Sequence, residues 1–216
     1  MPNKQFTFSR SRRHYETDAP LTEHGKAIAG IIGLEMESND QNPNVIYAAP
    51  EMKCVETAME LVKRSQSQVL IRVDPSLCDW RGFAVKGSHK HWLTVEQMRK
   101  LGYPIDKAYR PLMSLEEVPS SENPAEYYNR LVTFYERIVE KNSEKAIVVV
   151  AHPTTVFLTE DGRWSTSKHL TRVDKLIGTC EVSGVHISAE GQVTHRQVVK
   201  SFTRNLNDAR DLQRKR

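Results

Sequence analysis

Residues 146–151 form an unbroken apolar run, Ala-Ile-Val-Val-Val-Ala, that ends at His152. A short apolar run of this kind is typical of a strand buried on both faces of a parallel sheet. Such strands deliver their last residue to the carboxyl edge of the sheet, where open α/β folds bind ligands. Pro153 and two threonines follow, which suits the start of a helix whose unpaired N–H groups favour anions. His152 is therefore a candidate to bind phosphate or carry a proton near neutral pH, and a histidine that merely caps the loop is an equally weighted alternative.

Strand and helix patterns alternate along the chain, which predicts a three-layer α/β/α sandwich with a mostly parallel central sheet. The expected strands are residues 5–8, 45–47, 69–73 and 146–151, and the expected helices are 23–36, which follows Thr22 as N-cap, 51–65, 94–101 and 125–141. Residues 179–187 and 192–199 predict a hairpin.

The length of 216 residues fits a single domain that spans residues 1–216. Between residues 74 and 124 the periodic signal weakens, and loops rich in Gly, Pro, Ser and His surround the expected helix 94–101. We expect this segment to be an inserted cover over the sheet edge, with a simple long connection as the alternative. Residues from about 205 to 216 predict a polar tail.

The charge balance is modestly basic, with 31 Lys+Arg against 27 Asp+Glu and a net charge of +4. No basic stripe is interleaved with aromatic residues, so we expect no nucleic-acid partner and favour a phosphate ester or a phosphorylated protein. No segment has the apolar length of a signal peptide or a membrane span, which predicts a cytoplasmic protein without a membrane partner. The pattern is compatible with a homodimer.

Three cysteines, Cys54, Cys78 and Cys180, are widely spaced and lack metal-site or redox spacing, so reduced thiols are expected. His89 and His91 have a spacing seen in metal sites, but a polar loop is the favoured interpretation because no third ligand lies nearby. We therefore expect neither a metal nor another cofactor.

Two further strand ends carry polar candidates. Lys53 falls in the first turn of the helix after residues 45–47, where it could add positive charge to an anion site; a solvated surface lysine is the alternative. Asp79 follows the strand at residues 69–73 and could act as a general acid or base; a turn or cap residue is the alternative.

The chain resembles the histidine phosphatase superfamily, also called the phosphoglycerate-mutase-like fold. It is most similar to the branch of suppressor-of-T-cell-receptor-signalling phosphatases and insect ecdysteroid-phosphate phosphatase. Five segments carry the resemblance in family order: Arg13-His14-Tyr15-Glu16-Thr17-Asp18-Ala19-Pro20-Leu21-Thr22 with Gly25, residues 46–58, residues 71–80, Tyr109-Arg110-Pro111, and Val148-Val149-Val150-Ala151-His152.

By this resemblance His152 matches a phosphate-binding histidine of the family, and Asp79 falls where the branch has a glutamate acid. Lys53 stands where the family has an arginine, and Arg10 and Arg13 complete the expected phosphate pocket. A lysine there exchanges a bidentate clamp for a point charge.

The family's nucleophile is a histidine in an Arg-His-Gly triplet at the end of the first strand. Here residues 6–8 lead into Ser9-Arg10-Ser11-Arg12-Arg13, which contains no histidine. The covalent route then lacks its first step. This predicts a pseudophosphatase that binds phosphate groups without turning them over.

The alternative is an active phosphomonoesterase in which His14 is the nucleophile, although no apolar strand leads directly into His14 and Tyr15 replaces the glycine. A third interpretation is an interaction module with a vestigial pocket.

Overall fold

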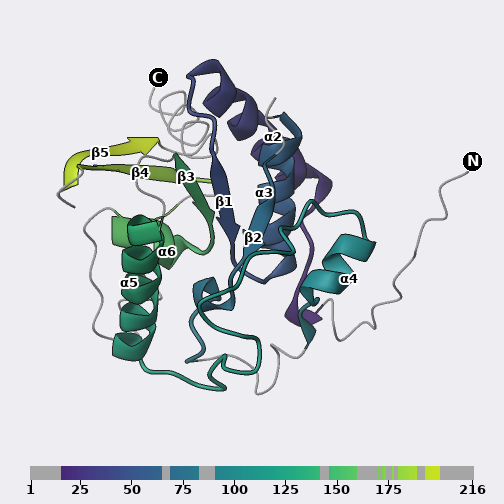
Figure 1. The fold of residues 1–216 in the computed structure, drawn as a ribbon, viewed down its shortest axis with the longest axis vertical. Coiled ribbons are helices and arrows are strands. Elements are labelled where there is room, and N and C mark those ends of the chain that lie inside the picture. The colour runs from purple at the N-terminus through teal and green to yellow at the C-terminus, as the bar shows by residue number, and fades with distance from the viewer. Residues whose placement is uncertain are drawn as a thin grey trace, which may run out of the picture.

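The computed structural model describes residues 16–64, 69–82, 91–141, 146–159, 170, 172–173, 177, 180–188 and 193–199. Figure 1 shows how its elements are arranged. The helices are α2 (Glu23–Ser38), α3 (Met52–Arg64), α4 (Val95–Lys100), α5 (Pro124–Lys141) and α6 (Pro153–Thr159), with the 3₁₀ helix η1 (Pro75–Leu77). The strands are β1 (Val45–Ala48), β2 (Ile71–Val73), β3 (Ile147–Val150), β4 (Val182–Ile187) and β5 (Val193–Val199).

The central sheet is parallel, and its described strands have the order β2-β1-β3. Ile46 of β1 lies opposite Ile71 of β2 and Val148 of β3, so one strand aligns both neighbours. Because the three strands run in the same direction, their carboxyl ends lie at one edge of the sheet. This edge carries the candidate site.

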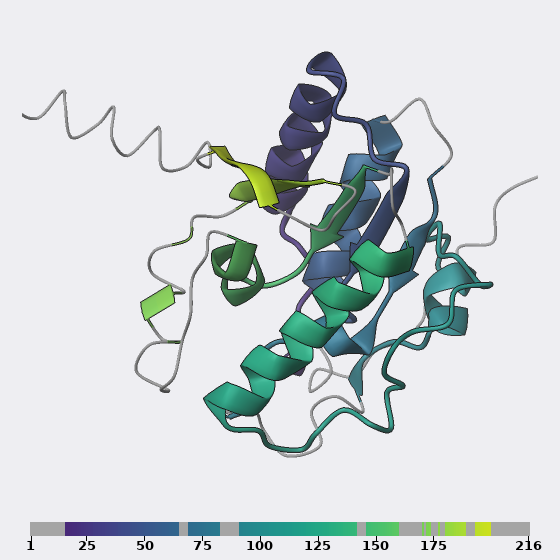
Figure 2. The same cartoon turned by 60° about the vertical axis from the view of Figure 1, so that its left-hand side comes forward.

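The two faces of β1 are buried against different helices, as expected for a strand in which successive side chains point to opposite faces. Val45 and Tyr47 pack in one cluster with residues of α5, and Ile46 and Ala48 pack in another with residues of α3. In Figure 2 the long α5 and the shorter α3 lie on opposite sides of these strands. The expected three-layer α/β/α arrangement is confirmed, with α2 packed on α3 as an outer helix.

The amphipathic pattern of α5 predicts an inner face made of Tyr128, Leu131, Val132, Tyr135, Ile138 and Val139. Leu131 and Ile138 are buried as expected and the other four are partly buried, but Tyr127 and Phe134 are also buried and were not expected. The buried side chains are spaced three and four residues apart. They are Tyr127, Leu131, Phe134 and Ile138. The difference arises because Tyr127 reaches across to α6, where its hydroxyl lies 2.5 Å from Thr154 Oγ1.

Side chains define the starts of three helices. Thr22 Oγ1 accepts from Gly25 N at 3.1 Å at the start of α2, as expected for an N-cap. Thr94 and Gln97 form a capping box at the start of α4. At α5, Asn123 Oδ1 accepts from Ala125 N and Glu126 N, and Pro124 begins the helix, where its missing N–H costs nothing.

The segment between β2 and α5 is organised by Asp74, a fully buried carboxylate. Its Oδ1 accepts from Ser76 N and Ser76 Oγ, and its Oδ2 accepts from Tyr109 Oη at 2.5 Å and from Leu112 N at 2.9 Å. One side chain therefore joins the loop after β2 to the loop at residues 109–112. The role of residues 74–124 as a cover stays a prediction.

The expected hairpin is present as β4 and β5, an antiparallel pair separate from the central sheet, with an irregularity between His186 and Ile187. The expected strand 5–8 and the polar tail 205–216 lie outside the described residues.

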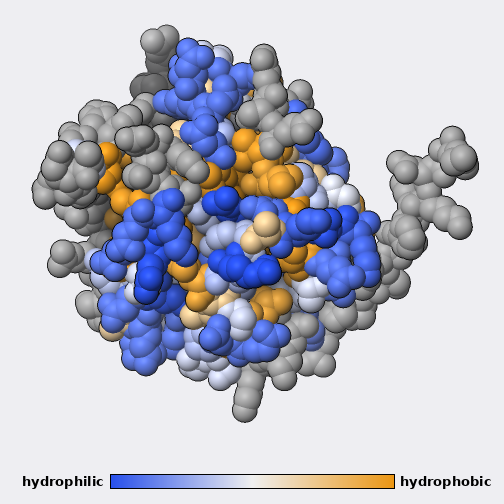
Figure 3. Space-filling model, in the orientation of Figure 1, coloured by the Kyte–Doolittle hydropathy of each residue, from blue (hydrophilic) through white to orange (hydrophobic). Residues whose placement is uncertain are grey.

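The surface is mainly hydrophilic on the side shown in Figure 3, where apolar residues are visible in several separate patches. On α2, Ile31 and Leu34 are among the exposed large apolar side chains. Within the part of the chain that the structure describes, no helix is both long enough and apolar enough to cross a membrane.

Candidate functional site

Three strand ends deliver side chains to one point at the carboxyl edge of the sheet. Glu51 lies in the short turn between β1 and α3, and Cys54 follows in the first turn of α3. His152 comes two residues after β3, and Asp79 follows β2 and η1. The parallel order of the strands thus brings together residues that are up to 101 positions apart, as the sheet-edge rule predicts.

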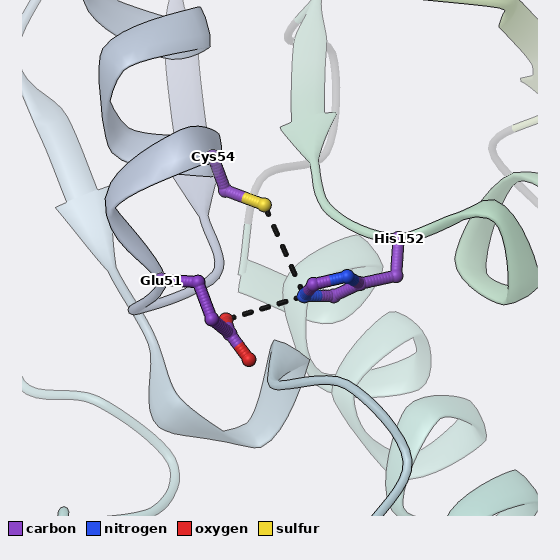
Figure 4. Close-up of side chains that lie close together, drawn as sticks. All are labelled: Glu51, Cys54 and His152. Carbon is purple, nitrogen blue, oxygen red and sulfur yellow. Dashed lines mark hydrogen bonds and ion pairs between the residues drawn. The ribbon is translucent and has the colours of Figure 1, made fainter. Parts of the chain in front are cut away.

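His152 is at the centre of this group, and only 2% of it is exposed. Its Nε2 lies 3.2 Å from Glu51 Oε2 and 3.9 Å from Cys54 Sγ, and its Nδ1 lies 3.5 Å from Asp79 Oδ2. Figure 4 shows the Glu51 and Cys54 side chains converging on the same ring nitrogen. Both nitrogens of the imidazole therefore face carboxylates.

The carboxylate of Glu51 is buried and has a fixed orientation. Its Oε1 accepts a hydrogen bond from the backbone N–H of Asp79 at 3.0 Å. Its Oε2 has no hydrogen-bond partner among the described residues, so its contact with His152 is an ion pair without hydrogen-bond geometry. A buried carboxylate oxygen in this state requires a nearby positive charge.

Opposing effects set the protonation state of this pair. Burial alone would lower the pKa of His152, but the negative charges of Asp79 and Glu51 outweigh burial and raise that pKa well above its ordinary value of 6.5. Burial would likewise raise the pKa of Glu51, but the charge of His152 and the Asp79 N–H hold it below its ordinary value of 4.5. At neutral pH the pair is therefore an imidazolium and a carboxylate.

Arg130 of α5 holds the loop that carries Asp79. Its guanidinium donates to the carbonyl oxygens of Ser76 at 2.7 Å and Cys78 at 3.1 Å, and it forms a buried ion pair with Glu122 at 2.5 Å. The Glu122 carbonyl also accepts from the Trp80 indole N–H at 3.1 Å. Contacts on both sides of Asp79 thus fix its backbone, although its own side chain is half exposed.

The structure brings together two of the residues that we singled out in the sequence, His152 and Asp79. Asp79 acts there as a partner of His152 Nδ1, and its Oδ1 caps the next backbone N–H, that of Trp80, at 2.8 Å. Lys53 is exposed in the first turn of α3. The residues near it that contact His152 are Glu51 and Cys54. Arg10, Arg13 and His14 lie outside the described residues.

Of the two histidines that suggested a metal site, His91 is described and its Nδ1 lies 2.9 Å from Thr17 Oγ1. His89 lies outside the described residues.

Two residues of the site, Glu51 and Cys54, were missed in the sequence. The signal that could have found them is their spacing of three residues at the start of a helix, which places both on one face. Successive helical residues are rotated by about 100°, so Lys53 points away from the face that Cys54 shares with Glu51. The expectation for Lys53 rests on its charge, its place in the first turn and its match to a family arginine, and none of these determines which face of α3 it lies on.

The fold belongs to a recognised class of protein. A model of the histidine phosphatase superfamily (branch 1) matches residues 7–200, so the chain belongs to this superfamily and the resemblance seen in the sequence is confirmed.

Among its relatives, the mouse ubiquitin-associated and SH3 domain-containing protein B is 27% identical over 160 residues, 72% of this chain. The ecdysteroid-phosphate phosphatase of Drosophila melanogaster is 26% identical over 161 residues, again 72% of the chain. These matches span 25% and 21% of the relatives' own lengths.

A solved structure of the Bombyx mori ecdysone phosphate phosphatase in complex with tungstate has the same fold. It matches with a TM-score of 0.59 and 20% identity, and the match covers 87% of this chain and 73% of that one.

Proposed function

We propose that this chain is a pseudophosphatase, a member of the superfamily that binds the phosphate group of an ester or of a phosphorylated protein without hydrolysing it. The observation that carries the proposal is the double carboxylate contact of His152, at 3.2 Å from Glu51 and 3.5 Å from Asp79. An imidazolium held in this way can donate a hydrogen bond to a phosphate oxygen, but it has no lone pair with which to replace the nucleophilic histidine that the sequence lacks.

The sequence supports the loss of turnover independently. None of the eight histidines stands in an Arg-His-Gly triplet. Lys53 stands at the position of a family arginine and offers one point charge rather than a planar fork. The first change removes the group that would accept the phosphoryl group, and the second weakens the binding of its oxygens during transfer.

Glu51 gives the pocket a low affinity for phosphate. Its carboxylate takes the contact with His152 Nε2 that an oxyanion would need, and its charge repels a phosphate dianion. A phosphate group therefore has to displace Glu51 and to recruit Lys53, together with Arg10 and Arg13. That a related phosphatase was solved with tungstate, an oxyanion, supports the choice of ligand class.

The second function to be tested is an active phosphomonoesterase in which His14 attacks phosphorus. It is favoured because phosphatases are among the relatives of this chain, for example the ecdysteroid-phosphate phosphatase of Drosophila.

Hydrolysis of p-nitrophenyl phosphate and binding of tungstate, both measured in EDTA, test these functions. We expect no turnover above the buffer rate and weak tungstate binding that His152→Ala reduces further. Glu51→Gln should strengthen binding by about tenfold or more, since it removes a repulsion worth at least about 1.4 kcal/mol. Turnover that disappears in His14→Ala would establish the phosphomonoesterase instead. If neither the unmodified chain nor Glu51→Gln binds tungstate, the pocket is vestigial and the chain is an interaction module.

A further inference from the structure

Around His152 Nε2 the chain gathers one nitrogen, one oxygen and one sulfur donor. Glu51, Cys54 and His152 each supply one potential ligand atom, and these atoms all lie within 4.8 Å of one another. All three residues are buried, which separates this group from the exposed acidic clusters common on protein surfaces. The edge of a tetrahedral zinc site is roughly 3.4 Å for bonds of about 2.1 Å, so side-chain movements of less than about 1.5 Å would close the group around an ion.

The orientation of Glu51 provides a second, independent sign of a ligand. Its Oε1 is held by the Asp79 N–H, and its Oε2 is buried without a hydrogen-bond partner among the described residues while it points toward Nε2. One oxygen is thus anchored and the other is presented, as in a monodentate metal ligand whose second oxygen is hydrogen-bonded.

Asp79 supplies the outer partner that metal-binding histidines have. Its Oδ2 lies 3.5 Å from His152 Nδ1, the ring nitrogen that Glu51 and Cys54 do not contact. A carboxylate at Nδ1 stabilises the proton there and leaves the Nε2 lone pair for a metal ion. Asp79 is therefore a positioning residue for His152 in this arrangement.

We infer that Glu51 Oε2, Cys54 Sγ and His152 Nε2 form a binding site for a divalent transition metal, with Zn²⁺ as the ion that fits best. Mixed oxygen, sulfur and imidazole donors suit Zn²⁺, whereas Mg²⁺ and Ca²⁺ prefer oxygen alone. The ion would be bound by the Cys54 thiolate and by the lone pair of His152 Nε2, so binding releases protons to the buffer. Three protein donors leave a fourth position for water or an oxyanion.

The inference goes beyond the proposed function and does not depend on it. A pocket that a carboxylate makes poor for anions is, for the same reason, suited to a cation.

The test uses the full chain, stripped with EDTA and titrated with Zn²⁺ by calorimetry and with Co²⁺ by absorption. We expect one equivalent of each ion, and for Co²⁺ the thiolate charge-transfer absorption and strong visible bands of a tetrahedral site. Cys54→Ser and Glu51→Gln are nearly isosteric and each removes a direct ligand. Each should therefore reduce Zn²⁺ affinity by more than the roughly 10- to 100-fold that is typical when a residue hydrogen-bonded to a ligand is changed. Asp79→Asn should reduce it by about 10- to 100-fold and leave the thiolate band in place at saturation.

Matched controls separate this site from others in the chain. Cys180→Ser removes a thiol outside the group, and His91→Ala disrupts the paired histidines at 89 and 91; both should bind Zn²⁺ as the unmodified chain does. Absence of a thiolate–cobalt band in the unmodified chain overturns the inference even if the variants fail to fold. So does a band that survives in Cys54→Ser, or binding lost in His91→Ala. Hydrolysis in EDTA would refute only the pseudophosphatase proposal, so the two failures are distinguishable.

Discussion

The substitution Glu51→Gln tests the central electrostatic contact most directly. Glutamine keeps the volume of the side chain and an oxygen that can accept from the Asp79 N–H, but it removes the charge 3.2 Å from His152 Nε2. At an effective dielectric constant of 20, this attraction is worth about 5 kcal/mol before the cost of burying both ions. Because Asp79 still stabilises the imidazolium, we expect a net loss of roughly 2–3 kcal/mol in the free energy of unfolding at pH 5.5.

The loss should depend on pH in a defined direction. The raised pKa of His152 means that its contribution to stability is complete below 6.5 and declines as the pH rises through the higher folded-state value. The lowered pKa of Glu51 means that its contribution is complete above 4.5 and declines as the pH falls through the lower folded-state value. The ion pair is therefore most stabilising between about pH 4.5 and 6.5.

Urea unfolding in EDTA, followed by circular dichroism from pH 5 to 10, measures this difference. The matched control is Glu60→Gln on the same helix, which breaks an ion pair with the half-exposed Lys63. That control should cost no more than about 1 kcal/mol. A loss below about 1 kcal/mol for Glu51→Gln at pH 5.5, or a loss that does not shrink toward high pH, would refute the reasoning.

Three further substitutions test the structure that supports the site, each read from the urea midpoint at pH 7. Arg130→Met leaves Glu122 as an unpaired buried carboxylate and releases the carbonyls before Asp79, so we expect a loss of about 3–5 kcal/mol. Tyr109→Phe removes the hydroxyl donor to buried Asp74 and should cost about 1–3 kcal/mol. Thr22→Ala removes the N-cap of α2, whose side chain has no described contact with His152, and should cost about 1 kcal/mol without altering tungstate affinity. A midpoint unchanged in Arg130→Met would contradict the role assigned to that ion pair.

The strands were predictable where a continuous apolar run reports burial on both faces. This holds for β1, which is buried throughout, whereas the apolar run of β3 is only partly buried. The strand-end rule placed His152 and Asp79 after β3 and β2, the two strands that flank β1. The caps of α2 and α4 were also readable, because a threonine before an apolar stripe acts through local geometry alone.

The composition of the site was not predictable in the same way. Charge, first-turn position and family resemblance pointed to Lys53, whereas the helical rotation decides which side chain of α3 faces the sheet edge. Likewise, the burial of Tyr127 on α5 includes a contact with Thr154 across 27 residues, which periodicity alone does not encode. Arg130 and Glu122 become part of the site only through the loop that they hold.

Asp74 has a consequence for how the loops at the sheet edge can move. Its two oxygens accept hydrogen bonds from the buried segment that leads to Asp79 and from the loop at residues 109–112, so a displacement of either breaks bonds to the same carboxylate. The two loops thus share one buried anchor, and its removal would release both together.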